Sequence, residues 1–201
     1  MDPGHLVALE GIDGSGKSTA AHGIVRVLRD EGHEVVATRE PTDGPWGRRI
    51  REMAASGETV DPAEELRWFV EDRREHVRDV IEPGLAAGQI VLTDRYFLST
   101  VAYQGARGLD WRPLLADAER SFPVPDLALL FEIEPAAGLA RTRSRGDAAE
   151  PAFEEQHFLE RVAAIYAAIE RPWLQRIDAS RAPSIVAADA RARVDALLAA
   201  S

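Results

Sequence analysis

The sequence predicts an α/β fold in which a five-stranded parallel sheet carries helices on both faces. Short apolar runs alternate with longer segments whose apolar residues recur every three or four positions, the pattern of strands that alternate with helices. Such alternation is typical of a three-layer fold built on a parallel sheet. We expect strands at 6–10, 34–38, 90–93, 127–132 and 176–178, and helices at 17–31, 46–56, 62–87, 112–121, 136–145, 154–175 and 184–199.

The first strand leads into a glycine-rich loop with the spacing G-x-x-x-x-G-K-S, from Gly11 to Ser18. Backbone N–H groups of such a loop converge on phosphate, the lysine reaches the terminal phosphates, and the serine hydroxyl ligates Mg²⁺. Lys17 is the only lysine among 24 basic residues, so a compact ammonium group is retained where a guanidinium is too broad. The helix at 17–31 then aims its N-terminus at the anion. A glycine turn that binds nothing is the alternative, and the intact motif in this context argues against it.

Charged residues follow the second and third strands, at the end of a parallel sheet where ligands bind. The second strand runs into 38–41, Thr-Arg-Glu-Pro, and the third into 94–96, Asp-Arg-Tyr. An acid at a strand end beside a phosphate loop holds Mg²⁺ or its waters, and an arginine clamps phosphate with two hydrogen bonds. An exposed Asp–Arg pair that merely ends a strand is the alternative.

The helix predicted at 62–87 has an arginine within its apolar stripe. The stripe runs through Leu66, Phe69 and Val70, and Arg73 stands where the next apolar residue is expected. Phe69 and Arg73 lie one turn apart on one face, so together they offer a stacking surface and a forked donor for a flat base. A core phenylalanine beside an arginine that extends to solvent is the alternative, and periodicity alone favours it.

Arginines gather at the end of the helix predicted at 136–145. Arg141, Arg143 and Arg145 lie in its last turns and precede an irregular polar stretch at 146–152, which we interpret as a lid. Cations here complement the helix dipole, which accounts for part of the pattern. They also suit a triphosphate or the charge that develops during phosphoryl transfer.

Composition limits the class of protein. The 201 residues carry a formal net charge of −10 and no cysteine. The acidic balance argues against a nucleic-acid partner, and the lack of cysteine excludes disulfides and thiol catalysis. No segment has the length of a membrane span, and residues 1–9 do not have the pattern of a secretion signal. We therefore expect one cytoplasmic domain without a membrane partner.

Together these segments resemble the thymidylate kinases of bacteria and archaea over nearly the whole chain. The resemblance implies one domain over 1–201 with the P-loop NTPase fold and a short lid at about 141–153. It also implies the reaction ATP + dTMP → ADP + dTDP with Mg²⁺, in a homodimer whose face the apolar parts of helices 62–87 and 154–175 could supply. The matching segments are Glu10–Thr19, Thr38–Pro41, Asp94–Tyr96 with Ser99 and Ala102–Gly105, Arg141–Gly146, and Ile177–Ser180.

The resemblance assigns roles to individual residues. Asp13 would face the sugar hydroxyl, Arg39 and Arg95 would hold the acceptor phosphate, and Ser18 and Asp94 would hold Mg²⁺. Phe69 would stack on thymine, Arg73 would bond a thymine carbonyl, and Thr100 would meet the base edge. Tyr103 would crowd a ribose 2′-hydroxyl, with Ser99 and Gln104 beside it. Catalysis would rest on Lys17, Asp94, Arg95, Arg141, Arg143 and Arg145, and ATP would contact Gly11, Ile12, Asp13, Gly14, Ser15, Gly16, Lys17, Ser18, Thr19, Asp178 and Ala179.

The chain departs from the family pattern at two places. Residues 42–47 read Thr-Asp-Gly-Pro-Trp-Gly where many bacterial members have two glycines and a threonine, and residues 146–151 hold no arginine. Gly14 also replaces the arginine that some members carry, so the transition-state cation is expected from Arg141, Arg143 or Arg145. A kinase of another deoxynucleotide or nucleoside, or a nucleotide-dependent switch, is the alternative reading. A switch needs no second substrate pocket.

Overall fold

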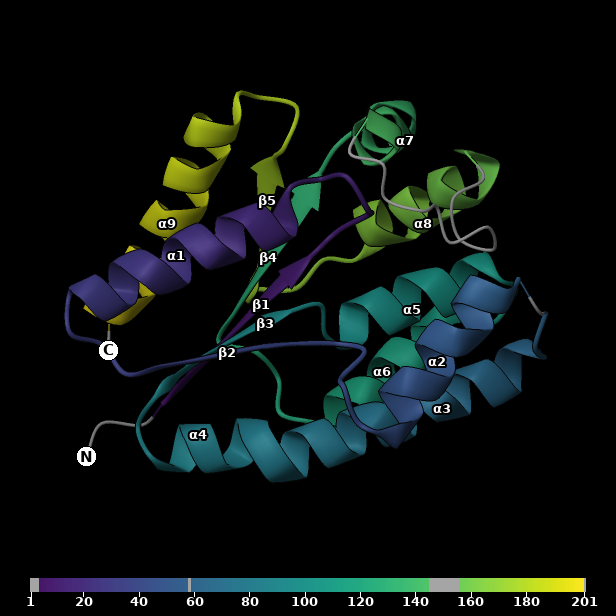
Figure 1. Cartoon of the computed structure of the whole chain (residues 1–201), viewed down its shortest axis with the longest axis horizontal. Helices are drawn as coiled ribbons and strands as arrows, with labels where there is room; N and C mark the ends of the chain where they lie inside the picture. Colours follow the sequence, from purple (N-terminus) through teal and green to yellow (C-terminus); the bar gives the residue numbers. More distant parts are fainter. Residues whose placement is uncertain (1–3, 58, 145–155, 201) are drawn as a thin grey trace.

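The computed structural model describes residues 4–57, 59–144 and 156–200, and its centre is a parallel sheet (Figure 1). Five strands lie in the order β2-β3-β1-β4-β5, and all neighbouring pairs are parallel. The predicted five-stranded parallel sheet is therefore confirmed. Its strands are β1 (His5–Glu10), β2 (Val35–Arg39), β3 (Ile90–Asp94), β4 (Leu127–Glu132) and β5 (Leu174–Asp178).

Helices cover both faces of the sheet, as the alternating pattern predicts. On one face α1 (Lys17–Asp30) packs beside α9 (Pro183–Ala199), and on the other α4 (Glu82–Ala86) packs on β3 (Figure 1). No helix within the described ranges is long and apolar enough to cross a membrane. The other helices are α2 (Pro45–Ser56), α3 (Pro62–His76), α5 (Phe97–Ala106), α6 (Trp111–Ser121), α7 (Pro135–Ser144) and α8 (Gln156–Ala168).

The strand register brings the predicted site segments together. In the central pairs Leu9 of β1 lies opposite Asp94 of β3, and Arg39 of β2 lies opposite the same Asp94. Because β1 ends where the glycine-rich loop begins, Arg39, Asp94 and the loop share one edge of the sheet. Parallel strands place their ligands at this edge.

Two glycines of the loop are required by the close approach of neighbouring backbone. Gly11 has φ of +136°, and a Cβ there would lie 2.5 Å from the carbonyl oxygen of Phe131. Gly14 has φ of +77°, and its Cβ would lie 2.2 Å from the carbonyl oxygen of Gly138 in α7. The left-handed region already favours glycine. The chain therefore has no room at position 14 for the arginine that some relatives carry.

The segment predicted as one helix at 62–87 contains a π-helical turn. After α3 the chain forms π-helix η1 (Val77–Ile81), and α4 follows without a break. The N–H of Glu82 donates to the carbonyl of Val77, five residues earlier. Pro83 has no N–H and would clash with the carbonyl four residues before it in an α-helix. The wider turn accommodates this proline inside a long helix.

Two predicted boundaries are wrong. The helix expected at 154–175 ends at Ala168 in α8, and β5 begins at Leu174 rather than 176, because Pro172 cannot continue a helix. Helix α5 is not among the helices that apolar periodicity predicts. It is buried on nearly all sides, so its sequence has little polar face to mark a helical period.

The unusual segment at 42–47 is fixed by α3. The Asp72 carboxylate accepts hydrogen bonds from the backbone N–H of Thr42 at 2.8 Å and from its hydroxyl at 2.6 Å. The first turn of α2 then lies directly against this loop, since a Cβ on Gly47 would come within 1.9 Å of the Thr42 carbonyl oxygen. The loop and α2 therefore pack backbone to backbone.

We predict opposite effects of alanine at two helical glycines. Gly47→Ala should lower the free energy of unfolding by about 1–3 kcal/mol, because the methyl group displaces the Thr42 loop. Gly23→Ala in α1, where no heavy atom lies within 4 Å of the added Cβ, should raise it by about 0.5–1 kcal/mol through helix propensity. Urea unfolding of both variants checks this, and a Gly47→Ala protein as stable as the parent would contradict the packing described.

Candidate active site

A cavity of about 640 Å³ opens at the carboxyl ends of the strands. The glycine-rich loop, the end of β2, and helices α2, α3, α5 and α7 contribute to its wall. Most of the residues predicted for the acceptor lie on it, together with Lys17 and Ser18 of the phosphate loop. The acceptor residues on it are Asp13, Arg39, Phe69, Arg95, Ser99, Thr100 and Tyr103.

Three charged side chains converge on one wall of this cavity. Arg95 donates from Nη2 to Asp13 Oδ1 at 2.5 Å, and Lys17 Nζ lies 4.0 Å from the same oxygen. Burial opposes ionisation of Asp13, but Arg95 and Lys17 outweigh it and lower the pKa of that carboxyl to about 2. The carboxylate thus stands between two cations, where an anionic ligand would also be held.

Lys17 is buried at the start of α1. Its Nζ donates to the carbonyl oxygen of Ile12 at 2.8 Å. Burial and the neighbouring Arg95 cation lower the pKa of Lys17 to about 8, although nearby carboxylates partly compensate. The single lysine of the chain is therefore held in a dry, positively charged corner of the phosphate-binding loop.

Arg95 adopts a strained backbone conformation. Its φ is +70°, the only positive value for a non-glycine residue in the described part of the chain. The N–H of Arg95 donates to the Leu9 carbonyl at 2.9 Å, and its Nη1 donates to Ser99 Oγ at 3.0 Å and to the Gly11 carbonyl at 3.2 Å. Strained non-glycine residues persist where surrounding contacts over-determine them, and they cluster at functional sites.

Glu10 lies buried beneath the cavity and was not predicted as a site residue. Its carboxylate accepts the Tyr96 N–H at 3.0 Å, the Ser99 hydroxyl at 2.5 Å and the Tyr166 hydroxyl at 3.2 Å. Burial raises the pKa of Glu10 to about 7, against the lowering effect of Ser99 and Arg95. Glu10 therefore joins the start of α5 to α8 and fixes Ser99, which in turn holds Arg95.

Ser18 and Asp94 meet at the mouth of the loop, as predicted for a metal site. The Ser18 hydroxyl donates to Asp94 Oδ2 at 2.5 Å, while Asp94 Oδ1 is buried without a hydrogen-bond partner among the described residues. An unsatisfied carboxylate oxygen beside a hydroxyl suits a hard divalent cation. Mg²⁺ in such sites takes one or two carboxylates, with substrate phosphates and water completing its shell.

Two predicted substrate residues do not lie on the wall of the cavity. Arg73 is 2% exposed and lies behind the wall, where it donates to Glu40 and Thr100. Gln104 is fully buried in α5 and is not among the residues that line the cavity, contrary to the expectation that it lines the pocket. The buried face of α3 also differs from the predicted stripe, since Leu66, Phe69 and Val70 are only half-buried. That face consists of Glu65, Trp68, Asp72, Arg73 and His76.

Arg51 of α2 lines the cavity and was missed. It donates to the carbonyls of Pro41 at 3.0 Å and Thr42 at 2.7 Å, and it pairs with Asp43. No sequence pattern singles out Arg51, because Arg48 and Arg49 lie in the same helix. Only the fold shows that Arg51, and not the other two, faces this cavity. With Arg39 and Arg95 it is a third arginine on the cavity wall.

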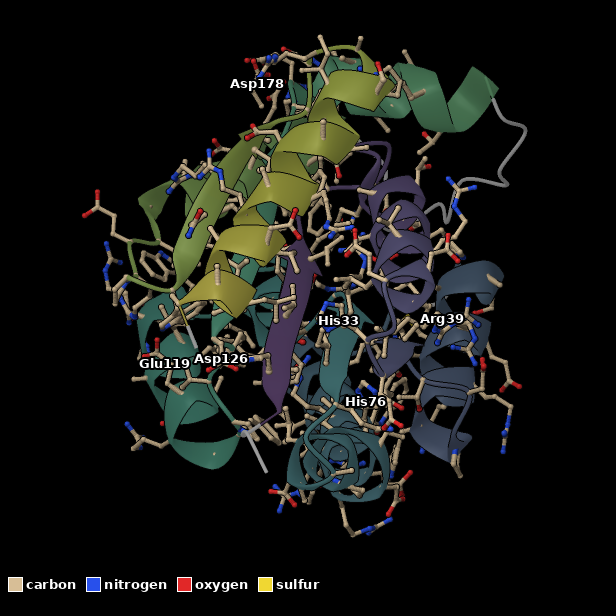
Figure 2. The ribbon with its side chains drawn as sticks, turned by 90° about the vertical axis from the view of Figure 1, so that its left-hand side faces the viewer. His33, Arg39, His76, Glu119, Asp126 and Asp178 are labelled. Carbon is tan, nitrogen blue, oxygen red and sulfur yellow. The ribbon has the colours of Figure 1, made fainter. Side chains whose placement is uncertain are left out.

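The segment predicted for the adenine side lies at the opposite edge of the sheet. Figure 2 shows Asp178 of β5 far from Arg39 of β2, which belong to the two edge strands. Arg141 of α7 donates to the Ala179 carbonyl at 3.0 Å, so the predicted residues Arg141 and Ala179 are in contact. Arg145 and the rest of the predicted lid to 153 lie outside the described residues, as does the side chain of Arg143.

Comparison with known proteins gives one family. A family model described as thymidylate kinase matches residues 9–190. A thymidylate kinase of Xanthomonas campestris is 49% identical over 196 residues, which cover 98% of this chain and 85% of the relative. A thymidylate kinase of Desulfotalea psychrophila is 43% identical over 199 residues, 98% of this chain and 97% of the relative.

We predict that Glu10 makes stability fall as the pH rises above about 5. The unfolded chain releases the proton near the ordinary value of 4.5, and the folded chain keeps it until about 7. The folded state therefore binds more protons between these values, and its stability decreases through that window. Glu10→Gln should reduce the stability difference between pH 5 and pH 8 by about 2–3 kcal/mol. Denaturant unfolding at both values checks this, and unchanged pH dependence in the variant would contradict a buried, protonated Glu10.

Proposed function

The chain belongs to the thymidylate kinase family, and we propose that its cavity holds dTMP beside ATP for transfer of the γ-phosphate. The reaction is ATP + dTMP → ADP + dTDP. The observation that carries the proposal is the convergence of Lys17, Asp13 and Arg95 in one cavity that also exposes an aromatic ring, Phe69. In such a cavity Lys17 would face the phosphates of ATP, and Arg95 would face the phosphate of dTMP.

The donor side is built from the glycine-rich loop and α7. Residues 11–19 would hold the ATP phosphates through backbone N–H groups, and Lys17 would reach the terminal phosphates. Arg141 donates to the Ala179 carbonyl, and the loop at 178–179 would contact the adenine. Arg141, Arg143 and Arg145 would supply the cations that stabilise the transferring phosphoryl group.

The acceptor phosphate would bind between Arg39, Arg95 and Arg51. All three line the cavity, and arginine meets phosphate with paired hydrogen bonds. Asp13 would then turn to the sugar hydroxyl as the phosphate takes over its pairing with the cations. The attacking phosphate oxygen is already ionised, so catalysis needs positioning and charge neutralisation rather than a general base.

Ser18 and Asp94 would hold Mg²⁺. The unpaired, buried Asp94 Oδ1 and the adjacent hydroxyl fit that ion. No group of three or more acidic, histidine or cysteine side chains gathers for a metal among the described residues, which agrees with a cation held largely by phosphate oxygens and water. When bound, Mg²⁺ neutralises phosphate charge and orients the two phosphates.

The base and sugar would occupy the side of the cavity lined by Phe69, Thr100 and Tyr103. Phe69 would stack on thymine, and Thr100 would meet the base edge. Arg73 lies behind the wall and donates to Thr100 at 2.8 Å, so it would support the Thr100 contact with the thymine carbonyl. Ring contact with Phe158 and burial hold Tyr103 in place, where its ring closes the space for a 2′-hydroxyl.

A homodimer and a cytoplasmic location complete the proposal. The homodimer follows from the family resemblance, and the lack of cysteine fits the cytoplasm. The helices at 62–87 and α8 would supply the face for a second copy. The alternatives of another kinase substrate or a switch have no feature that favours them, since a switch needs no acceptor cavity.

We predict that Tyr103 selects deoxyribose by its bulk. The protein should phosphorylate dTMP with a kcat/KM about 10–100-fold above that for ribothymidine monophosphate, the discrimination expected for one excluded group. Tyr103→Phe should keep this ratio, because the hydroxyl contacts with Asp13 and Arg95 are long, at 3.5 Å, and the ring keeps its bulk. Tyr103→Ala should lower it.

A coupled ADP-release assay with a panel of nucleoside monophosphates measures these ratios. Transfer to none of the panel would sink the proposed function, and equal kcat/KM for the ribo and deoxy nucleotides in the unmodified protein would refute the role of Tyr103.

A further inference from the structure

A continuous chain of hydrogen bonds runs behind the cavity wall from β2 through α3 to α5. It links the Thr38 hydroxyl, the His76 ring, the Glu40 carboxylate, the Arg73 guanidinium and the Thr100 hydroxyl. We infer that His76 is a positioning residue for base selection, which fixes the direction of the Glu40 carboxylate so that the wall presents hydrogen-bond donors to the base. The inference rests on the proposed function and names how that site selects its base.

Both carboxylate oxygens of Glu40 take part in this chain of hydrogen bonds. Its Oε2 accepts from Arg73 Nε at 2.9 Å and Nη2 at 2.5 Å, and its Oε1 meets His76 Nδ1 at 2.9 Å. Glu40, Arg73 and His76 are 6%, 2% and 3% exposed. Because buried polar groups are costly without partners, each of these contacts constrains the next.

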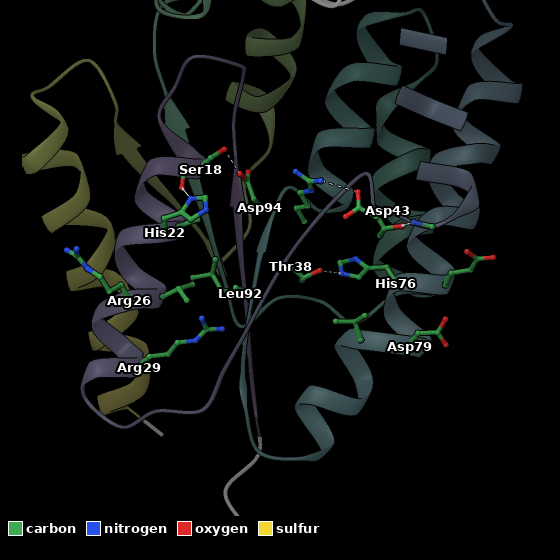
Figure 3. A pocket seen from close by; sticks show the side chains of 18 of the residues that line it. Ser18, His22, Arg26, Arg29, Thr38, Asp43, His76, Asp79, Leu92 and Asp94 are labelled. Atoms are coloured by element: carbon green, nitrogen blue, oxygen red, sulfur yellow. Dashed lines mark hydrogen bonds and ion pairs between the residues drawn. The ribbon is translucent and has the colours of Figure 1, made fainter. Parts of the chain in front are cut away.

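The hydrogen-bond directions follow from the acceptor character of Glu40. An ionised carboxylate only accepts, so His76 Nδ1 must carry a proton and donate it. His76 Nε2 then accepts from the Thr38 hydroxyl at 2.7 Å, the contact drawn in Figure 3. A neutral imidazole satisfies both contacts, and Thr38 fixes its tautomer from the β2 side.

The same directions leave donors facing the base. Thr100 Oγ1 accepts from Arg73 Nη2 at 2.8 Å, so its own proton remains available to donate. Arg73 has only N–H groups to offer. Glu40 also lines the cavity, and His76 and Arg73 hold its two carboxylate oxygens in place.

This arrangement favours a base with a carbonyl at the position that Thr100 reaches, with Arg73 behind it. Thymine presents an oxygen there, and cytosine presents an amino group that would meet the Thr100 donor. Without the His76 contact, the Glu40 carboxylate would be free to turn and accept from that amino group. His76 therefore acts against the wrong base by fixing the direction in which Glu40 accepts.

The order hydroxyl, imidazole, carboxylate is also that of a hydrolase triad. Thr38 and His76 even line a second cavity of about 880 Å³, between α1 and α3 (Figure 3). In this chain, however, the second oxygen of the carboxylate is committed to Arg73, which opposes the build-up of positive charge on the imidazole that a triad requires. A positioning role of His76 explains why Arg73 and His76 each hold one carboxylate oxygen of Glu40. Nucleophilic catalysis by Thr38 does not explain the contact with Arg73.

Two amide substitutions separate the two contacts of His76. In His76→Asn the amide nitrogen lies where Nδ1 was and keeps the bond to Glu40. In His76→Gln the amide lies where Nε2 was, so it keeps the Thr38 contact and releases Glu40. His33→Gln, at an exposed histidine between α1 and β2, controls for the change of residue type.

We expect His76→Gln to lower the ratio of kcat/KM for dTMP over dCMP at least tenfold and to raise KM for dTMP. Its kcat with dTMP and its KM for ATP should stay within twofold of the parent. His76→Asn and His33→Gln should keep the parent ratio. An unchanged ratio in His76→Gln, or an equal loss in His76→Asn, would overturn the inference.

A second measurement uses the unmodified protein and does not depend on how the variants fold. ¹⁵N NMR of the His76 ring should show the Nδ1–H tautomer, and the Nε2–H tautomer would overturn the inference. Absence of dTMP phosphorylation by the unmodified protein would instead count against the proposed function. Normal dTMP activity combined with an unaffected glutamine variant would count against the role of His76 alone.

Discussion

The pairing of Asp13 with Lys17 and Arg95 is the constraint on which the site depends. Two cations converge at the carboxyl ends of β1 and β3, and a carboxylate between them offsets their repulsion. The backbone conformation matches this arrangement. Arg95 has a positive φ, and the lack of a side chain at Gly11 leaves room for the neighbouring strand β4. Phosphate is an anion like this carboxylate, so the two cations suit a phosphate group as well.

A second, wholly buried charge network lies one layer further in. Glu40, Arg73 and His76 satisfy one another, and Asp72 on the same helix holds the Thr42 loop. Buried ion pairs are weak contributors to stability, since their attraction barely offsets desolvation. Their value here is geometric, because they fix the loop after β2 and the wall of α5 against one helix.

The sequence predicts the sheet and the phosphate loop well, because both depend on local signals. Apolar runs bounded by turns mark the strands, and one short motif defines the loop. The missed residues are polar groups whose partners lie far away in the chain. The Tyr166 hydroxyl donates to Glu10, which lies 156 residues earlier in the chain. His76 contacts Glu40, which lies 36 residues earlier. The spacing of apolar residues cannot distinguish a buried polar helix face from a solvated one. For this reason the sequence pattern presents Arg73 as an interruption of an apolar stripe, whereas the structure places it on a buried polar face of α3.

Selective labelling of Lys17 tests the central claim most directly. The chain has one lysine, and a pKa of about 8 leaves much of its amine unprotonated and reactive at pH 8. An amine-directed reagent followed by mass spectrometry should modify Lys17 and the N-terminus, with the N-terminus as internal reference. ATP with Mg²⁺ should slow modification of Lys17 at least tenfold and leave the N-terminus unchanged. Equal labelling of Lys17 with and without saturating ATP would contradict the account.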